Sequence, residues 1–165
     1  MFRALMFLLG WTFMPGALAA QVPTRSPGGA WVSGSLGAAT PHGTGLYGTA
    51  AIRYRRVVVR ARYATAFEFL GDFKEDWGGL VGLVLTRPSY RGLVVAAAGV
   101  GQVRGSRGCL LCGSAPDEPV LGALADLEFR YPFTKELGFS TYIYADFNSD
   151  RSFGGLPVGL YLGSI

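Results

Sequence analysis

Residues able to act as a nucleophile, a base and an acid occur in the polar segments that separate the apolar runs of this chain. His42 is the only histidine. The candidate serines and carboxylates in later segments are Asp72, Glu75, Asp76, Ser106 and Ser114. A serine, a histidine and a carboxylate within hydrogen-bonding reach can carry out acyl transfer. The spacing here singles out no nucleophile, so we predict no catalytic residue.

The two cysteines stand three residues apart, at Cys109 and Cys112. In an oxidising compartment a lone pair of cysteines usually forms a disulfide, which would shape the tip of this segment. A thioredoxin-like redox role needs a strand–helix–strand context that is missing from the sequence. A structural zinc site needs four ligands, and two cysteines with one distant histidine supply three. We therefore predict no metal and no cofactor, and the redox state of the pair stays open.

Charged and polar aromatic residues alternate with apolar residues in several segments. In one of them Asp126, Glu128 and Arg130 alternate with Leu127 and Phe129. Alternate residues of an extended strand share a face, so such side chains point to one side of a sheet. The predicted inward set is Arg53, Arg60, Arg62, Glu68, Asp126, Glu128, Arg130, Tyr142, Tyr144 and Asp146.

A closed barrel is the arrangement that would bring this inward set together. The interior of an eight-stranded barrel is only just wide enough for side chains to fill it. Burying a charge without a partner costs several kcal/mol per ion. We expect these groups to pair with one another as a polar plug, and a narrow pore remains the alternative if the pairs can exchange partners.

The segments that must position these residues have period-2 patterning and no sustained helical period. Their expected bounds are 29–39, 46–54, 57–69, 77–86, 92–103, 120–131, 136–147 and 156–164. They are longer than the five or six residues usual in globular sheets. Their length suits the 9 to 11 residues with which a tilted strand crosses a bilayer. The predicted fold is therefore an all-β, eight-stranded antiparallel up-and-down transmembrane barrel.

The face opposite the charges is apolar, which indicates lipid as the solvent. Half of the 165 residues are apolar and only 16% are charged, whereas ordinary soluble domains carry about 25% charged residues. The segments 77–86 and 92–103 are apolar or small on both faces, so their orientation cannot be assigned. A net charge of +4 without a nucleic-acid motif gives no reason to expect a nucleic-acid partner.

The connections alternate between longer and shorter ones, as in outer-membrane barrels with long external loops and short periplasmic turns. Segments 70–76 and 104–119 are expected to be external loops, which places Glu75 and Asp76 outside the barrel. The short turns are basic, with Arg55, Arg56, Arg87, Arg91 and Lys135 against Glu136. Both ends of the barrel segment then lie on the turn side.

The first residues have the order of a secretory signal peptide: one arginine, a short apolar run, Pro15-Gly16 and a small-residue cleavage site. We expect a signal peptide over 1–20, a short leader over 21–28 and the barrel over 29–165. A single N-terminal anchor helix is the alternative, and Pro15-Gly16 disfavours it.

The chain resembles the small eight-stranded outer-membrane barrels, of the outer membrane protein A-like and outer membrane protein X-like kind. The resemblance rests on the architecture above and on glycine-rich strands such as Gly34-Ser35-Leu36-Gly37 and the closing stretch 158–163. It implies a monomer in the bacterial outer membrane, in contact with lipid and with the barrel-assembly machinery during biogenesis. The chain departs from such barrels at its end, where Ile165 stands in place of the usual aromatic residue.

The expected function is that of a non-enzymatic outer-membrane protein of structural, surface-interaction or narrow-pore type, with its external partner unspecified. Two alternatives from other classes stay open. One is a secreted lipocalin-like barrel that carries an apolar ligand, which would need an apolar interior. The other is a lipid A-modifying enzyme built around His42.

Overall fold

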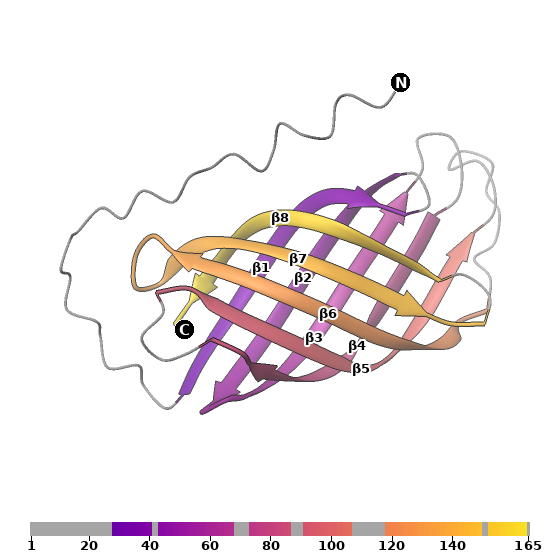
Figure 1. The fold of residues 1–165 in the computed structure, drawn as a ribbon. Coiled ribbons are helices and arrows are strands. Elements are labelled where there is room, and N and C mark those ends of the chain that lie inside the picture. Colours follow the sequence, from indigo (N-terminus) through magenta and orange to yellow (C-terminus); the bar gives the residue numbers. More distant parts are fainter. Residues whose placement is uncertain are drawn as a thin grey trace, which may run out of the picture.

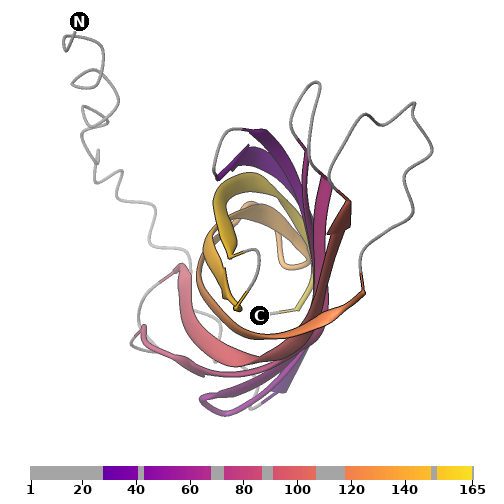
Figure 2. The same ribbon diagram turned by 90° about the vertical axis from the view of Figure 1, so that its right-hand side faces the viewer.

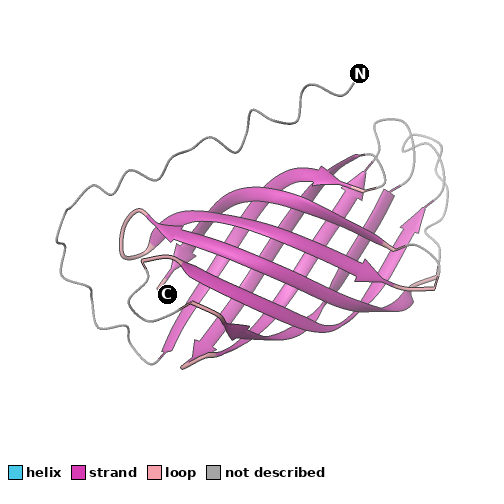
Figure 3. Cartoon of the chain, in the orientation of Figure 1, coloured by secondary structure: helices cyan, strands magenta, loops and turns pink. Residues whose placement is uncertain are grey.

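The fold is a closed barrel of eight antiparallel strands (Figure 1). The computed structural model describes residues 28–40, 43–67, 73–86, 91–106, 118–149 and 152–164. The strands are β1 (Gly28–Ala39), β2 (Gly43–Tyr54), β3 (Val57–Phe67), β4 (Phe73–Val84), β5 (Leu93–Ser106), β6 (Val120–Pro132), β7 (Leu137–Phe147) and β8 (Phe153–Gly163). Within the described residues no helix is long and apolar enough to cross a membrane, and strands account for nearly all of them (Figure 3).

Each strand pairs with its neighbours in sequence, and the barrel closes where β1 pairs with β8. In this closing pair Trp31 lies opposite Gly163 and Ala39 lies opposite Gly155. The ring of strands is visible when the molecule is seen from its loop end (Figure 2). Closure leaves no strand edge unpaired, which is the condition for a sheet in hydrocarbon, where nothing else can satisfy backbone hydrogen bonds.

The predicted fold class is confirmed, and the main corrections are to strand starts. β4 begins at Phe73, four residues before the expected start at Trp77, and β2 and β8 each begin three residues early. β5 continues to Ser106, so its end is also later than expected. Polar residues at these strand ends look like loop residues in the sequence, although they continue the alternation of the strand.

Exposed aliphatic side chains form a band on the outer wall of the barrel. Ile52, Leu121 and Ile143 are 67%, 72% and 51% exposed. The two strands whose orientation was left open follow the same rule, since Val81 on β4 and Val100 on β5 face outward. A band of exposed aliphatic side chains of this kind is suited to lipid and not to water.

The interior is layered along the barrel. At the end formed by the short turns, buried apolar side chains form one cluster: Trp31, Ala51, Val58, Val84, Leu93, Val95 and Tyr161. Towards the loop end a second cluster contains the rings of Tyr47, Tyr142, Tyr144 and Phe153. The buried charges lie between and among these two clusters.

Two facing glycines make room for a buried leucine side chain. Gly78 on β4 pairs with Gly101 on β5. A Cβ added to either would come within 2.6 or 2.7 Å of Leu124 Cδ1, which is closer than atoms can approach. Leu124, on β6 beside β5, therefore packs its side chain directly against the bare backbone of the adjoining strands β4 and β5.

The apolar wall predicts how the barrel tolerates an outward arginine. Ile143 lies in the middle of β7 and Leu137 at its start, and both point outward. Ile143→Arg should lower the free energy of unfolding by about 2–4 kcal/mol and Leu137→Arg by about 0–1, because the cost of a charge falls towards the membrane interface. Urea unfolding in phosphatidylcholine vesicles measures both values, with Ile143→Leu as control. Equal losses at the two positions would contradict the orientation of β7.

Candidate functional site

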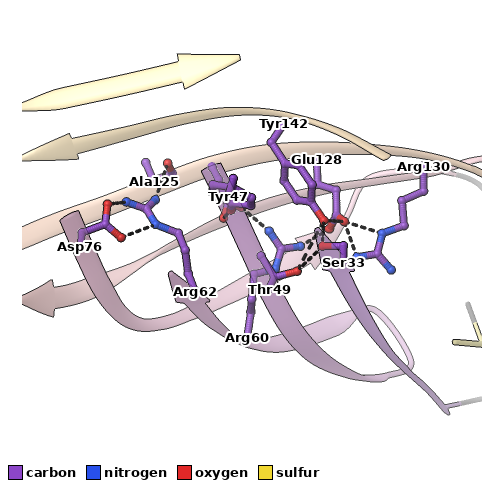
Figure 4. Close-up of polar contacts among 11 residues, drawn as sticks. Ser33, Tyr47, Thr49, Arg60, Arg62, Asp76, Ala125, Glu128, Arg130 and Tyr142 are labelled. Atoms are coloured by element: carbon purple, nitrogen blue, oxygen red, sulfur yellow. Dashed lines mark hydrogen bonds and ion pairs between the residues drawn. The ribbon is translucent and has the colours of Figure 1, made fainter. Parts of the chain in front are cut away.

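The centre of the barrel holds Arg60 between two carboxylates (Figure 4). Arg60 Nη1 donates to Asp126 Oδ1 at 2.6 Å, and its Nη2 donates to Glu128. The other oxygen of Asp126 accepts a hydrogen bond from the Tyr47 hydroxyl at 2.6 Å. The side chains of Arg60, Asp126 and Glu128 have no exposed surface. β3 and β6 are not neighbours in the sheet, so this bridge spans the lumen.

Glu128 is shared by several donors. Arg130, two residues along β6, forms an ion pair with it, and the Tyr142 hydroxyl donates to it from β7. The Tyr142 hydroxyl also hydrogen-bonds to Ser33 Oγ on β1 at 2.6 Å, and Ser33 Oγ hydrogen-bonds to Thr49 Oγ1 on β2 at 2.8 Å. A single polar network therefore connects β1 and β2 to β3, β6 and β7.

A second ion pair lies closer to the loop end. Arg62 Nε donates to Asp76 Oδ1 at 3.0 Å and its Nη2 donates to the other carboxylate oxygen, so the pair is bidentate. Arg62 Nη1 reaches the backbone oxygen of Ala125 at 3.3 Å on the far wall. The guanidinium also lies 5.3 Å from the ring centre of Tyr144. Bidentate pairs of this kind fix geometry as well as charge.

Two aromatic rings lie close to Arg130, near the turn end of β6. The guanidinium carbon of Arg130 lies 3.8 Å from the ring centre of Trp31 and 5.0 Å from that of Tyr161. All three residues are buried. Such contacts stabilise a desolvated cation by about 2 kcal/mol. They connect the ion network to the apolar cluster that fills the turn end of the barrel.

The buried charges of the lumen balance one another in number. The described inward groups are Arg53, Arg60, Arg62 and Arg130 against Asp76, Asp126, Glu128 and Asp146. Among the described residues no three His, Cys, Asp or Glu side chains are placed to hold a metal ion. The arrangement is suited to filling and cross-linking the lumen.

Most members of the predicted inward set lie within the described strands. Arg53 is buried on β2, Tyr144 packs against Tyr47, and Asp146 accepts a hydrogen bond from the Asn148 side chain at 3.0 Å. Glu68 lies outside the described residues. So do Cys109, Cys112, His42, Asp72 and Ser114.

The sequence prediction placed Asp76 and Glu75 in an external loop, and the structure corrects both. Asp76 lies on β4, faces the lumen and is fully buried against Arg62. Asp76 shares its face with Gly78 and Leu80, so extending the alternation of this strand backwards would have found it.

Glu75, its neighbour, points to the outer wall. There it accepts a hydrogen bond from the Tyr63 hydroxyl at 2.9 Å and pairs with Arg104 of β5. Arg104, expected to begin the next loop, is therefore also a strand residue. This outward pair lies at the loop end of the wall, beyond the aliphatic band.

Solved structures with the same architecture include three bacterial proteins. Neisserial surface protein A matches with a TM-score of 0.62 and 13% identity, covering 82% of this chain and 94% of that chain. The N-terminal β-barrel domain of Pseudomonas aeruginosa OprF matches with a TM-score of 0.61 and 8% identity, covering 84% of this chain and 98% of that chain. Ail of Yersinia pestis, in complex with the heparin analogue sucrose octasulfate, matches with a TM-score of 0.58 and 10% identity, covering 82% of this chain and 97% of that chain. The fold is that of a small outer-membrane β-barrel.

This outer-membrane barrel fold also supports catalysis in at least one protein. The outer membrane enzyme PagL matches with a TM-score of 0.50 and 12% identity, covering 81% of this chain and 99% of that chain. No protein-family model and no curated protein matches the sequence. The likeness therefore establishes the barrel fold, and the activity must be argued from the side chains.

We expect removal of one partner of the Arg62–Asp76 pair to destabilise the barrel more than replacement of both partners. Asp76→Ala would leave Arg62 buried without its carboxylate, and the free energy of unfolding should fall by about 3–5 kcal/mol. Replacing both residues, as Arg62→Met with Asp76→Leu, should recover most of this loss, because no unpaired charge remains. Urea unfolding of the folded barrel in detergent measures the three proteins, with Glu118→Ala at an exposed position as control. An unchanged midpoint for Asp76→Ala would show that the pair is not buried as described.

Proposed function

We propose that this chain is an integral outer-membrane barrel of structural or surface-interaction type whose lumen is closed. The filled lumen is the observation that carries the proposal. Val58, Leu93 and Val95 are 0% exposed at the turn end, and the bridge from Arg60 to Asp126 and Glu128 crosses the centre. An ion would have to displace both layers to pass.

The polarity of the barrel supports a membrane location over a soluble carrier. A lipocalin-like protein would present a polar surface to water and an apolar cavity to its ligand. Here the charged residues Arg60, Arg62 and Glu128 are inside, and Ile52 and Leu121 are exposed on the outer wall. Export by the signal peptide over 1–20, assembly by the barrel-assembly machinery and a monomeric state belong to the same proposal.

A surface role is supported by the location of the longer connections at one end of the barrel. Among the similar structures, one is described as a surface protein and another as an attachment and invasion protein. The external partner is a molecule recognised by the loops.

Cell fractionation tests the proposed location. The full chain should be recovered in the outer-membrane fraction and should migrate differently on gels before and after boiling, because closed barrels resist unfolding by detergent.

His42→Ala is the variant that tests the enzyme alternative. Lipid extracts from cells expressing each protein should be identical if the barrel is not a lipid-modifying enzyme. Recovery as a soluble monomer, or loss of a lipid modification in His42→Ala, would overturn the proposal.

A further inference from the structure

The short turns carry a ring of exposed cations at one end of the barrel. We call this end the turn rim and define it by the described charged residues of the turns: Arg55, Arg56, Arg91, Lys135 and Glu136. All five are exposed, and only one is a carboxylate. At the loop end, by contrast, the described charges Lys74 and Arg104 are offset by Glu75 and Glu118. Positive charge is therefore concentrated at the turn rim.

Two of these arginines lie over tyrosines of the outer wall. The guanidinium carbon of Arg55 is 5.4 Å from the ring centre of Tyr54, and that of Arg91 is 5.9 Å from the ring centre of Tyr131. The two tyrosines are 63% and 48% exposed and point away from the lumen. Stacking keeps each cation at the outer circumference of the barrel, above the wall, and away from the lumen.

Arg55 has a left-handed backbone conformation, which favours glycine over residues with a side chain. Arg55 has φ of 55°, and it is the one non-glycine residue with positive φ in the described part of the chain. Two-residue hairpin turns favour Asn-Gly or Asp-Gly, which adopt such angles at little cost, whereas Arg55 and Arg56 occupy this turn. A bulky residue in this region costs of order 1 kcal/mol or more, which indicates that the side chain is used.

The turn rim borders the apolar wall directly. Val57 directly follows Arg56 and Leu137 directly follows Glu136, and both side chains are exposed on the outer wall. When that wall is in hydrocarbon, the rim cations lie at the level where lipid phosphates are found. Arginine and tyrosine at this level are typical interfacial anchors, and arginine pairs strongly with phosphate.

We infer that the turn rim is a docking surface for the phosphate headgroups of anionic phospholipids in the adjacent leaflet. Arg55 and Arg91, each stacked on its tyrosine, contact the phosphates, and Arg56 and Lys135 add to the attraction. The inference rests on the proposed membrane location. It adds a lipid class and the residues that select it.

Spin-labelled lipids test this preference in vesicles. The full chain is reconstituted in phosphatidylcholine vesicles that contain a trace of spin-labelled phosphatidylglycerol or of spin-labelled phosphatidylcholine. Electron paramagnetic resonance then gives the motionally restricted fraction of each. The variant is Arg55→Gln with Arg91→Gln, and the matched control is Lys74→Gln with Arg104→Gln, which removes the same charge at the other end. A gel shift on boiling checks insertion of every protein.

The wild type should restrict phosphatidylglycerol more strongly than phosphatidylcholine, and salt should weaken this preference. A surface cation contributes about fivefold to association with an anionic lipid surface. The preference of the turn-rim variant for phosphatidylglycerol should therefore fall by at least about that factor. The control variant should keep the wild-type preference. An inserted wild type without preference, or an equal loss in variant and control, would overturn the inference and leave the barrel intact. Failure of the wild type to insert would overturn the proposed function as well.

Discussion

The bridge from Arg60 to Asp126 and Glu128 is the constraint on which the rest of this barrel depends. A charge removed from water must be paired and hydrogen-bonded, or it costs several kcal/mol. Arg60 meets this condition only if β3 faces β6 across a lumen narrow enough for a direct contact. The Tyr47 and Tyr142 hydroxyls then satisfy further carboxylate oxygens. The barrel's width, its register and its polar content are therefore mutually dependent.

The barrel has charged residues inside and apolar residues outside, the reverse of a water-soluble barrel, and this polarity follows from that constraint. With charges, tyrosines and compact apolar clusters filling the inside, most of the large aliphatic residues are left for the outer wall. Such a wall is suited to lipid, and a closed hydrogen-bonded ring of strands is the form of sheet that lipid accepts. The two ends then differ in kind. The turn end carries cations on a short, tight rim, and the loop end carries longer connections and the outward Glu75–Arg104 pair.

Strict alternation made the faces of β3, β6 and β7 predictable from the sequence, and with them the inward direction of Arg60, Asp126 and Tyr142. It failed where a strand begins with polar residues, which is why Asp76 was expected outside the barrel and the start of β4 was placed four residues late. The alternation also could not assign the faces of β4 and β5, because their residues are small or apolar on both faces. The pairing of Arg62 with Asp76 depends on register, and period-2 patterning carries no register. Contacts across the lumen, such as Arg60 with Glu128, need the closed barrel itself.

Single-channel recording in planar lipid bilayers tests the closed, ion-paired lumen most directly. Folded wild-type protein should give no steady conductance at moderate voltage, because the apolar turn-side cluster and the central bridge block the lumen in series. Arg60→Ala with Glu128→Ala, combined with Leu93→Ala, removes the central bridge and opens a gap in the apolar cluster, so the folded variant should produce a measurable current. Steady conductance in the wild type, at the level of a water-filled lumen, would contradict the account.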